Sequence, residues 1–393
     1  MKRYDFDTPI DRHGTGSIKF DNAEARHRSP DLLSLWVADM DFRTPDEVIE
    51  ALVARSQHGI FGYTDPDRGY FDAVETWLKS HYAIDVEDDD IVVTPGVVYA
   101  LATCVRAFTN PEDAVLIQPP VYYPFFSVVV QNGRRLVEVP LAYEDGSYHI
   151  DFDAFESALS TERPKLFILC SPHNPVGRVW TPEELERLYE LCAEYGTLII
   201  SDEIHADFVR PGITHTSLAA LHPDNRSGII TCTSASKTFN LAGLQVANIV
   251  IPDSQLRHRF KDTMLSGGYS QVNALGLEAT RAAYTYGEPW LDQLRSYLEG
   301  NWQLLADRLA ETDGRLSLIP AEGTYLAWID CKELGLDPLA LERFIEDEAG
   351  LWLDCGHIFG KPGEGFIRIN IATQRAYLDR AATQLVDAVK RHV

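Results

Sequence analysis

Long apolar runs are missing from this chain. Its 393 residues are 45% hydrophobic, yet no stretch approaches the roughly 20 consecutive apolar residues of a membrane-spanning helix. The first seven residues are mainly charged and aromatic, and they lack the apolar segment of a secretory signal peptide. We therefore expect a protein of the cytoplasm that does not bind membranes.

Basic residues are also scarce. Lysine and arginine number 35 against 59 aspartates and glutamates, and the formal net charge is −24 at pH 7. Such a charge repels polyanions at long range, which disfavours nucleic acids and anionic lipid surfaces as partners. The six cysteines form no Cys-x-x-Cys pair, so we expect reduced thiols and no metal site.

What the chain does contain is an alternation of short apolar runs with amphipathic, helix-like segments. This alternation predicts an α/β protein with crossover connections and a mainly parallel sheet. One helix is predicted at 182–195, because Thr181 and Glu184 form a capping box and Gly196 ends the pattern. The apolar runs lie at 91–93, 115–117, 166–169, 198–200, 229–230 and 249–251.

One lysine follows an apolar run in a setting that suits covalent chemistry. Lys237 ends the string Ser-Ala-Ser-Lys at 234–237, shortly after the run at 229–230. An amine attacks an aldehyde only when it is unprotonated, so such a lysine needs a pocket that lowers its pKa. Serine hydroxyls and free N–H groups at a loop-to-helix junction suit a phosphate dianion. Taken alone, the motif fits a solvated surface lysine equally well.

Two more polar side chains follow neighbouring runs. Asp202 comes after the run at 198–200, and Asn174 lies in a Pro/Asn/Gly turn after the run at 166–169. Singly, they indicate a helix cap and a turn residue. In a parallel sheet, however, ligands bind beyond the carboxyl ends of the strands. There a carboxylate can keep a pyridine nitrogen protonated and an amide can donate to a phenolate oxygen, so the two residues and Lys237 converge on one cofactor.

The order Asn174, Asp202, Lys237 resembles the pyridoxal 5'-phosphate (PLP) enzymes of fold type I, the aspartate aminotransferase superfamily. Within it, four strings resemble the MalY/PatB-type cysteine-S-conjugate β-lyases, also called cystathionine β-lyases. These strings are Leu-Trp-Val-Ala-Asp-Met-Asp-Phe at 35–42, Pro-Pro-Val-Tyr-Tyr-Pro-Phe at 119–125, Asp-Glu-Ile-His at 202–205 and Lys-Thr-Phe-Asn-Leu-Ala-Gly-Leu-Gln at 237–245.

The resemblance implies a mainly parallel seven-stranded sheet in a large domain, with helices on both faces, and a smaller α+β domain. We place the large PLP-binding domain at 46–275 and the C-terminal small domain at 276–393. The N-terminal segment, 1–45, is expected to associate with the small domain.

The resemblance also implies the residues that bind the cofactor. Lys237 would form the Schiff base, Asp202 would face the ring nitrogen, and Asn174 the phenolic oxygen. His205 stands where aminotransferases often have a tyrosine that bonds this oxygen; whether it makes that bond or only buttresses Asp202 stays open. Tyr122 would stack on the ring. The phosphate would be bound by the turn of Gly96, Val97 and Val98 and by the Ser234 hydroxyl.

The resemblance also implies which residues bind the substrate and which one reaches the partner subunit. Arg368, in a strand-like run at 365–371, would bind the α-carboxylate beside the backbone of Ala38, although an arginine in such a run also suits a structural ion pair. Tyr63 would reach across a homodimer interface to the neighbouring active site. Aspartate aminotransferase has an arginine eight residues after its lysine, whereas this chain has Gln245, as in the lyase-like string.

These residues predict a PLP-dependent carbon–sulfur β-lyase of amino-acid metabolism. It would cleave L-cystathionine or a related cysteine S-conjugate to a thiol such as homocysteine, pyruvate and ammonia, with Lys237, Asp202 and Tyr122 as catalytic residues. A broad-specificity aminotransferase would use the same lysine and aspartate and is the alternative. A third hypothesis is a PLP-binding regulator that docks to a transcription factor, although no appended DNA-binding segment is visible.

Overall fold

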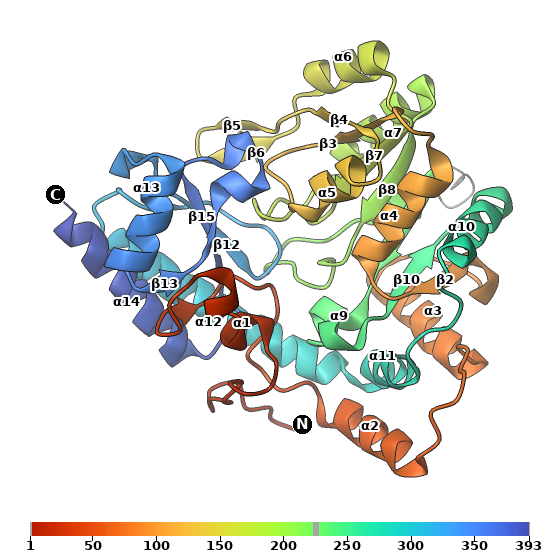
Figure 1. Cartoon of the computed structure of the whole chain (residues 1–393), viewed down its shortest axis with the longest axis horizontal. Coiled ribbons are helices and arrows are strands. Elements are labelled where there is room, and N and C mark those ends of the chain that lie inside the picture. The colour runs from red at the N-terminus through yellow and green to blue at the C-terminus, as the bar shows by residue number, and fades with distance from the viewer. Residues whose placement is uncertain (1, 223–227, 393) are drawn as a thin grey trace.

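The computed structural model describes residues 2–222 and 228–392. Its centre is a seven-stranded sheet with the order β2-β10-β9-β8-β7-β3-β4 (Figure 1). Only β10 runs antiparallel to its neighbours, so the predicted mainly parallel sheet is confirmed. The strands are β2 (Ile91–Thr94), β3 (Ala114–Ile117), β4 (Arg135–Glu138), β7 (Leu166–Cys170), β8 (Leu198–Asp202), β9 (Ile229–Thr233) and β10 (Ala247–Val250).

Successive side chains of the central strands enter two different cores. In β3, Val115 packs into the core beneath one layer of helices and Leu116 into the core beneath the other. Because both faces are covered, the central strands are mainly apolar, and β3 and β7 are apolar at every position, which made them visible in the sequence. The first layer contains α4 (Val97–Phe108), α5 (Pro124–Val130) and α10 (Ser254–Ser266); the second contains α6 (Phe152–Glu162), α7 (Pro182–Tyr195) and α8 (Leu218–Leu221).

The helix predicted at 182–195 is α7. The Thr181 hydroxyl accepts the Glu184 N–H at 3.2 Å, and the Glu184 carboxylate accepts the Thr181 N–H at 2.8 Å. Gly196 ends the helix at φ 71°, a left-handed conformation that glycine adopts without steric cost. The chain then enters β8, which ends at Asp202.

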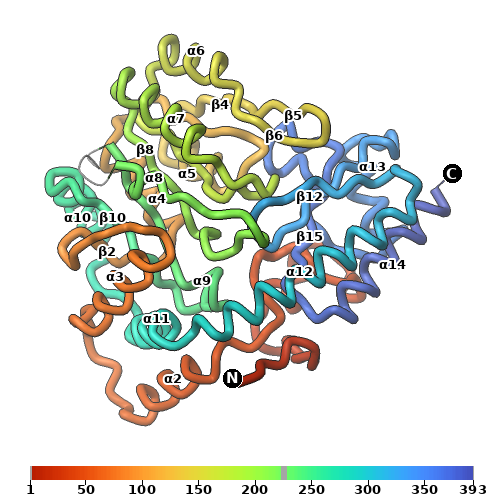
Figure 2. Tube along the Cα trace, turned by 180° about the vertical axis from the view of Figure 1, so that it is seen from behind, coloured from red at the N-terminus to blue at the C-terminus, as the bar shows by residue number. Residues whose placement is uncertain are grey.

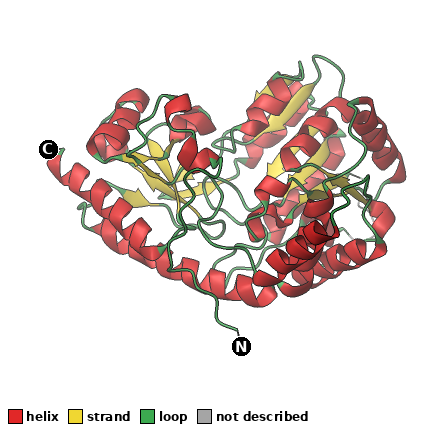
Figure 3. Cartoon of the chain, turned by 60° about the horizontal axis from the view of Figure 1, so that its bottom comes forward, coloured by secondary structure: helices red, strands yellow, loops and turns green. Residues whose placement is uncertain are grey.

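A smaller antiparallel sheet has the order β11-β12-β15-β14. Figure 3 shows its strands as a group apart from the central sheet, with a long helix, α12 (Glu288–Ala310), running beneath both. Figure 2 shows α12 beside α14 (Arg375–Arg391). The strands are β11 (Ser317–Leu318), β12 (Leu326–Asp330), β14 (Asp354–Cys355) and β15 (Phe366–Asn370), and β1 (Leu33–Ser34) pairs in parallel with β13 (Leu351–Trp352). The domain boundaries stay a prediction.

Shorter elements and peripheral helices complete the described chain. No helix in 2–222 or 228–392 is long and apolar enough to cross a membrane. These elements are α1 (Ile18–Asp21), α2 (Asp46–His58), α3 (Arg68–Tyr82), α9 (Ala235–Thr238), α11 (Ala274–Tyr286), α13 (Pro338–Arg343), β5 (Ala142–Glu144), β6 (Ser147–His149), η1 (Glu24–Arg26), η2 (Asp88–Asp90), η3 (Ala242–Leu244), η4 (Lys332–Leu334), η5 (Phe344–Glu348), η6 (Gly356–Phe359) and η7 (Lys361–Gly363).

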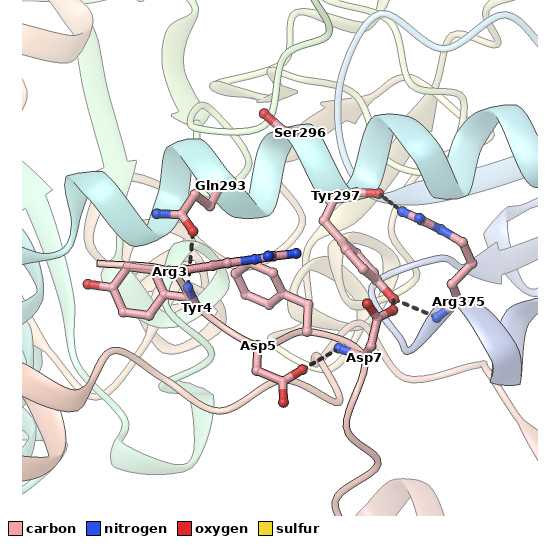
Figure 4. A pocket seen from close by; sticks show the side chains of 9 residues that line it. Arg3, Tyr4, Asp5, Asp7, Gln293, Ser296, Tyr297 and Arg375 are labelled. Atoms are coloured by element: carbon pink, nitrogen blue, oxygen red, sulfur yellow. Dashed lines mark hydrogen bonds between the residues drawn. The ribbon is translucent and has the colours of Figure 1, made fainter. Parts of the chain in front are cut away.

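The N-terminal segment is tied to α12. The Tyr4 N–H donates to Gln293 Oε1 at 3.0 Å, and the Tyr297 hydroxyl donates to Asp7 Oδ1 at 2.6 Å. The same hydroxyl accepts the Arg375 N–H at 2.7 Å, so one tyrosine joins the start of the chain, α12 and α14 (Figure 4). These contacts hold the segment that leads towards the site.

Asn301 on α12 holds the chain just beyond β15. Its amide donates to the carbonyls of Ile371 and Thr373 at 2.8 and 2.9 Å and accepts from Arg375 Nε at 3.2 Å, and the residue is fully buried. Asn301→Ala strands these buried groups, so we expect the free energy of unfolding to fall by about 2–4 kcal/mol. Urea denaturation measures the change. As a control, Gln303→Ala at an exposed neighbouring position should change the free energy of unfolding by less than about 0.5 kcal/mol. If both variants lose the same stability, Asn301 does not have this role.

Candidate active site

A cavity of about 270 Å³ lies at the carboxyl ends of the parallel strands. It brings together nine of the twelve residues predicted from the sequence and adds others that were not predicted. The nine are Ala38, Gly96, Val97, Val98, Tyr122, Asn174, Asp202, His205 and Lys237; the additions include Tyr99, Ser236 and Gln245. Ser234, Tyr63 and Arg368 lie outside this lining.

Lys237 is half-buried on the short helix α9, directly after β9. Its Nζ donates to the carbonyl oxygen of Ala38 at 2.8 Å. Burial lowers the pKa of the amine to about 8, because desolvation penalises the charged form. Asp39 and Asp202 oppose this shift and Arg368 adds to it. The lysine is therefore a stronger candidate nucleophile and base at neutral pH than an exposed one.

Asp202 is the last residue of β8 and is buried. One hydrogen bond reaches its side chain among the described residues, from the Ile204 N–H to Oδ1 at 3.2 Å. Burial raises the pKa of the carboxyl to about 7. A carboxylate with so little solvation is stabilised by a cation, and a protonated pyridine nitrogen is a cation of suitable shape.

Asn174 and Arg368 are joined by a hydrogen bond that orients both. Arg368 Nη1 donates to Asn174 Oδ1 at 2.9 Å. Because a guanidinium only donates, this bond fixes the amide with its oxygen towards Arg368 and leaves its NH₂ group as a donor for the cavity. That is the group needed to hydrogen-bond a phenolic oxygen.

Arg368 lies in the middle of β15 and is only 2% exposed. Nη2 donates to the Trp36 carbonyl at 2.8 Å and to Asp354, while Nε is buried without a partner among the described residues. Burial raises the pKa of Asp354 to about 6, although Arg368 opposes the shift. The structure thus contains the ion pair that sequence reasoning left open, and it leaves two N–H groups, on Nε and Nη1, without a partner among the described residues.

The predicted phosphate site lies at the start of α4. Gly96 is the N-cap at φ 136°, where an L side chain would be strained, and Val97 and Val98 begin the helix with N–H groups that have no intrahelical partner. The Tyr99 hydroxyl nearby is buried without a partner among the described residues. Together these donors suit a dianion.

Ser234, predicted to bind the phosphate, makes hydrogen bonds within its own chain. Its hydroxyl donates to the Val246 carbonyl at 2.7 Å and accepts the Ser236 N–H at 3.0 Å, so its only hydrogen is already used. Ser236 lines the cavity instead. Both serines precede Lys237 in one string, and only the turn into α9 decides which hydroxyl faces the cavity.

Tyr122 and His205 flank the cavity as neutral groups. Burial raises the pKa of the Tyr122 phenol above its ordinary value. Burial, Lys237 and Arg368 lower the pKa of His205 to about 3, so the imidazole is uncharged at neutral pH. His205 Nδ1 has no partner, and no hydrogen bond links the ring to Asp202 among the described residues. The geometry therefore does not support the buttressing alternative.

Tyr63 lies away from the cavity of its own chain. It is 95% exposed on the segment between α2 and α3, which forms no regular structure. Sequence reasoning also missed two groups near Lys237. The Tyr325 hydroxyl donates to the same Ala38 carbonyl at 3.0 Å, and Arg12 pairs with Asp39 at 2.6 Å. No local pattern marks these residues, because they lie on segments far apart in the sequence.

These residues fit pyridoxal 5'-phosphate. The cavity offers a half-buried amine with a lowered pKa for the aldehyde and a buried carboxylate for the ring nitrogen. The oriented amide of Asn174 can donate to the phenolic oxygen, and the N–H groups at the start of α4 can bind the phosphate. His205 Nδ1 and the Tyr99 hydroxyl are buried without a partner among the described residues, as expected of polar groups that bind a ligand.

Comparisons with known proteins agree with this geometry. Residues 30–385 match the family "Aminotransferase class I and II". Cystathionine beta-lyase PatB of Bacillus subtilis is 42% identical over 95% of this chain and 96% of its own length. Protein MalY of Escherichia coli is 33% identical over 98% and 99% of the two chains. The crystal structure of the PLP-bound C-S lyase from Staphylococcus hominis superposes with a TM-score of 0.92 at 36% identity, covering 99% and 98%. The fold is therefore that of the fold type I PLP enzymes, and the chain belongs to the class I and II aminotransferase family, in the group that includes PatB and MalY.

Proposed function

We propose that this protein cleaves L-cystathionine and related cysteine S-conjugates by α,β-elimination, releasing a thiol, pyruvate and ammonia. The chain is a PLP-dependent carbon–sulfur lyase; among its relatives, PatB is named a cystathionine beta-lyase and the Staphylococcus hominis enzyme a PLP-bound C-S lyase. The observation that carries the proposal is the match over 95% of the chain to cystathionine beta-lyase PatB, because an aminotransferase would use the same Lys237 and Asp202.

The chain's own residues account for the steps of the reaction. Bound PLP supplies an acceptor for the electron pair that Cα releases. Arg368 holds the α-carboxylate with its free N–H groups, beside the backbone of Ala38. Lys237 then removes the Cα proton as general base. With PLP bound, Asp202 would keep the ring nitrogen protonated, and Tyr122 would stack on the ring.

Bond breaking at Cβ completes the elimination. The Cβ–S bond breaks, and the sulfur leaves with the electron pair and takes up a proton to become a thiol. Addition of water to the remaining three-carbon fragment yields pyruvate and ammonia. An aminotransferase would use the same lysine but return the proton to the cofactor, so the fate of the Cβ–S bond separates the two activities.

The activity is tested with L-cystathionine and no keto-acid acceptor. We expect sustained, equimolar release of pyruvate and homocysteine over many turnovers of the PLP-loaded protein. Product assays with a ketoacid dehydrogenase and a thiol reagent measure both. If turnover of an amino donor requires added 2-oxoglutarate or pyruvate, the protein is an aminotransferase and the proposal fails.

The Asp202 carboxylate is expected to cost stability without PLP and to add stability with it. Its pKa is raised to about 7 in the fold, whereas an unfolded aspartate titrates near 4. Between these values the folded chain binds more protons, so its stability falls as pH rises from about 4 to about 7. Asp202→Asn removes this penalty, and the cofactor-free variant should be more stable above about pH 7 by on the order of 1–4 kcal/mol.

With PLP the order should reverse, because an amide cannot balance a protonated ring nitrogen. We expect PLP to raise the melting temperature of the wild type more than that of Asp202→Asn, and kcat of the variant to fall by about 100-fold or more. Circular dichroism melts with and without PLP at two pH values measure the first effect. Asp262→Asn, at an exposed carboxylate on α10, is the control. If PLP stabilises the wild type and Asp202→Asn equally, Asp202 does not contact the cofactor and its assignment is wrong.

We further propose a homodimer in which Tyr63 of one subunit completes the site of the other. Tyr63 shares its segment with Ile60 and Phe61, which are 66% and 59% exposed. Three large side chains on one irregular segment form an apolar surface that a second copy would cover. A cytoplasmic location is supported by the six cysteines, all free and buried, as in a reducing compartment.

Mixed dimers test the shared site. Tyr63→Phe and Lys237→Ala homodimers should each have low activity. In a two-fold dimer, co-expression of both chains should restore roughly a quarter of the wild-type activity, because half of the dimers are mixed and each has one intact site. Turnover of the mixture against each homodimer is the measurement. If Tyr63 serves its own chain, the mixture will stay as inactive as the homodimers.

A further inference from the structure

An arginine on the outer side of Arg368 has no assigned role. Arg26 is the last residue of η1 and is exposed. No carboxylate lies within ion-pair distance of its guanidinium among residues 2–222 and 228–392, although the chain carries 59 acidic residues. An unpaired cation in so acidic a protein is available for an anionic ligand.

Trp36 links Arg26 to the substrate-binding arginine. The guanidinium carbon of Arg26 lies 4.7 Å from the centre of the Trp36 ring, in a cation–π contact. The carbonyl of the same tryptophan accepts from Arg368 Nη2 at 2.8 Å. The Trp36 ring is itself held by stacking on Trp352, with 4.7 Å between ring centres. A single rigid residue therefore sets the spacing between the two guanidinium groups.

Further polar groups lie near Trp36 and Arg368. The Trp36 indole N–H is buried and has no partner among the described residues. Asp354, paired with Arg368, also lies within the electrostatic range of Arg26. Tyr123 is 38% exposed beside the cavity residue Tyr122, with 5.1 Å between ring centres. Asp354 and Trp36 thus each connect Arg368 with Arg26.

We propose that Arg26 binds the distal carboxylate of the leaving group. The preferred substrates are then cysteine S-conjugates whose sulfur carries a second carboxylate, such as L-cystathionine. Seven bonds join the two carboxyl carbons of cystathionine, which places them roughly 8 Å apart in an extended chain. When the α-carboxylate of cystathionine binds Arg368, its second carboxylate can therefore reach the guanidinium of Arg26 on the far side of Trp36. This inference rests on the proposed function, in which Arg368 binds the α-carboxylate.

A non-reacting probe tests the second arginine without any turnover. Suberate has two carboxylates separated by seven bonds, and octanoate has the same chain with one carboxylate. We expect the PLP-loaded protein to bind suberate about fivefold more tightly than octanoate, the size of one partly exposed ion pair. Salt should weaken this preference. Isothermal titration calorimetry at two ionic strengths measures both ligands.

Three variants complete the binding test. Arg26→Ala should abolish the preference for suberate, and Arg26→Lys should retain most of it. Arg259→Ala is the matched control, because Arg259 also lies over an aromatic ring, Phe108, at the opposite end of α4. It should bind both ligands as the wild type does. The proposal is overturned if the wild type shows no preference or if the preference survives Arg26→Ala.

Kinetics then connect the binding to the reaction. Arg26→Ala should raise KM for L-cystathionine about fivefold at unchanged kcat. The same variant should leave kcat/KM for S-methyl-L-cysteine, which has no distal carboxylate, unchanged. Equal losses on both substrates would contradict a role at the distal end. If the wild type cleaves no thioether, the proposed function fails, while the suberate measurement still decides whether Arg26 binds a second carboxylate.

Discussion

The site depends on the buried guanidinium of Arg368. A buried cation is costly unless its N–H groups are paired, and Arg368 pairs three of its five N–H groups with partners on three separate segments. They are the Trp36 carbonyl, the Asn174 amide and the Asp354 carboxylate. These bonds orient the amide towards the cavity and hold the segment that follows β1. Two residues further along, the Ala38 carbonyl accepts from Lys237. One arginine therefore holds both the Asn174 amide and the segment that carries the Ala38 carbonyl.

Burial drives the two central titratable groups towards their neutral forms. Desolvation lowers the pKa of Lys237 to about 8 and raises that of Asp202 to about 7. A free amine is what an aldehyde requires, so burial aids Lys237 directly. Burial destabilises the charged form of Asp202, and a protonated pyridine nitrogen beside it would stabilise that form. The same low polarity therefore prepares the lysine for reaction and selects the ring that binds opposite the aspartate.

Lyases and aminotransferases of this family share the lysine, the aspartate and the substrate arginine, so chemistry at Cα does not separate them. The difference arises at the sulfur, where the leaving group must be held. In this chain Arg26 and Trp36 stand beyond Arg368. Our proposal therefore places selection of the leaving group in the N-terminal segment, whereas Asn174, Asp202 and Lys237 lie at the strand ends of the central sheet.

The sequence by itself determined the parallel sheet and the residues at its strand ends. Buried strands such as β3 and β7 are apolar throughout, and chain order alone places Asn174, Asp202 and Lys237 at one edge. The edge strand β4 (Arg135–Glu138), with charged and exposed ends, was not recognisable, and neither was the reversed direction of β10. Only the tertiary structure decided that Ser236 faces the cavity and Ser234 does not. It alone brought Arg26 to Arg368, because contacts between distant segments depend on packing, which local patterns do not encode.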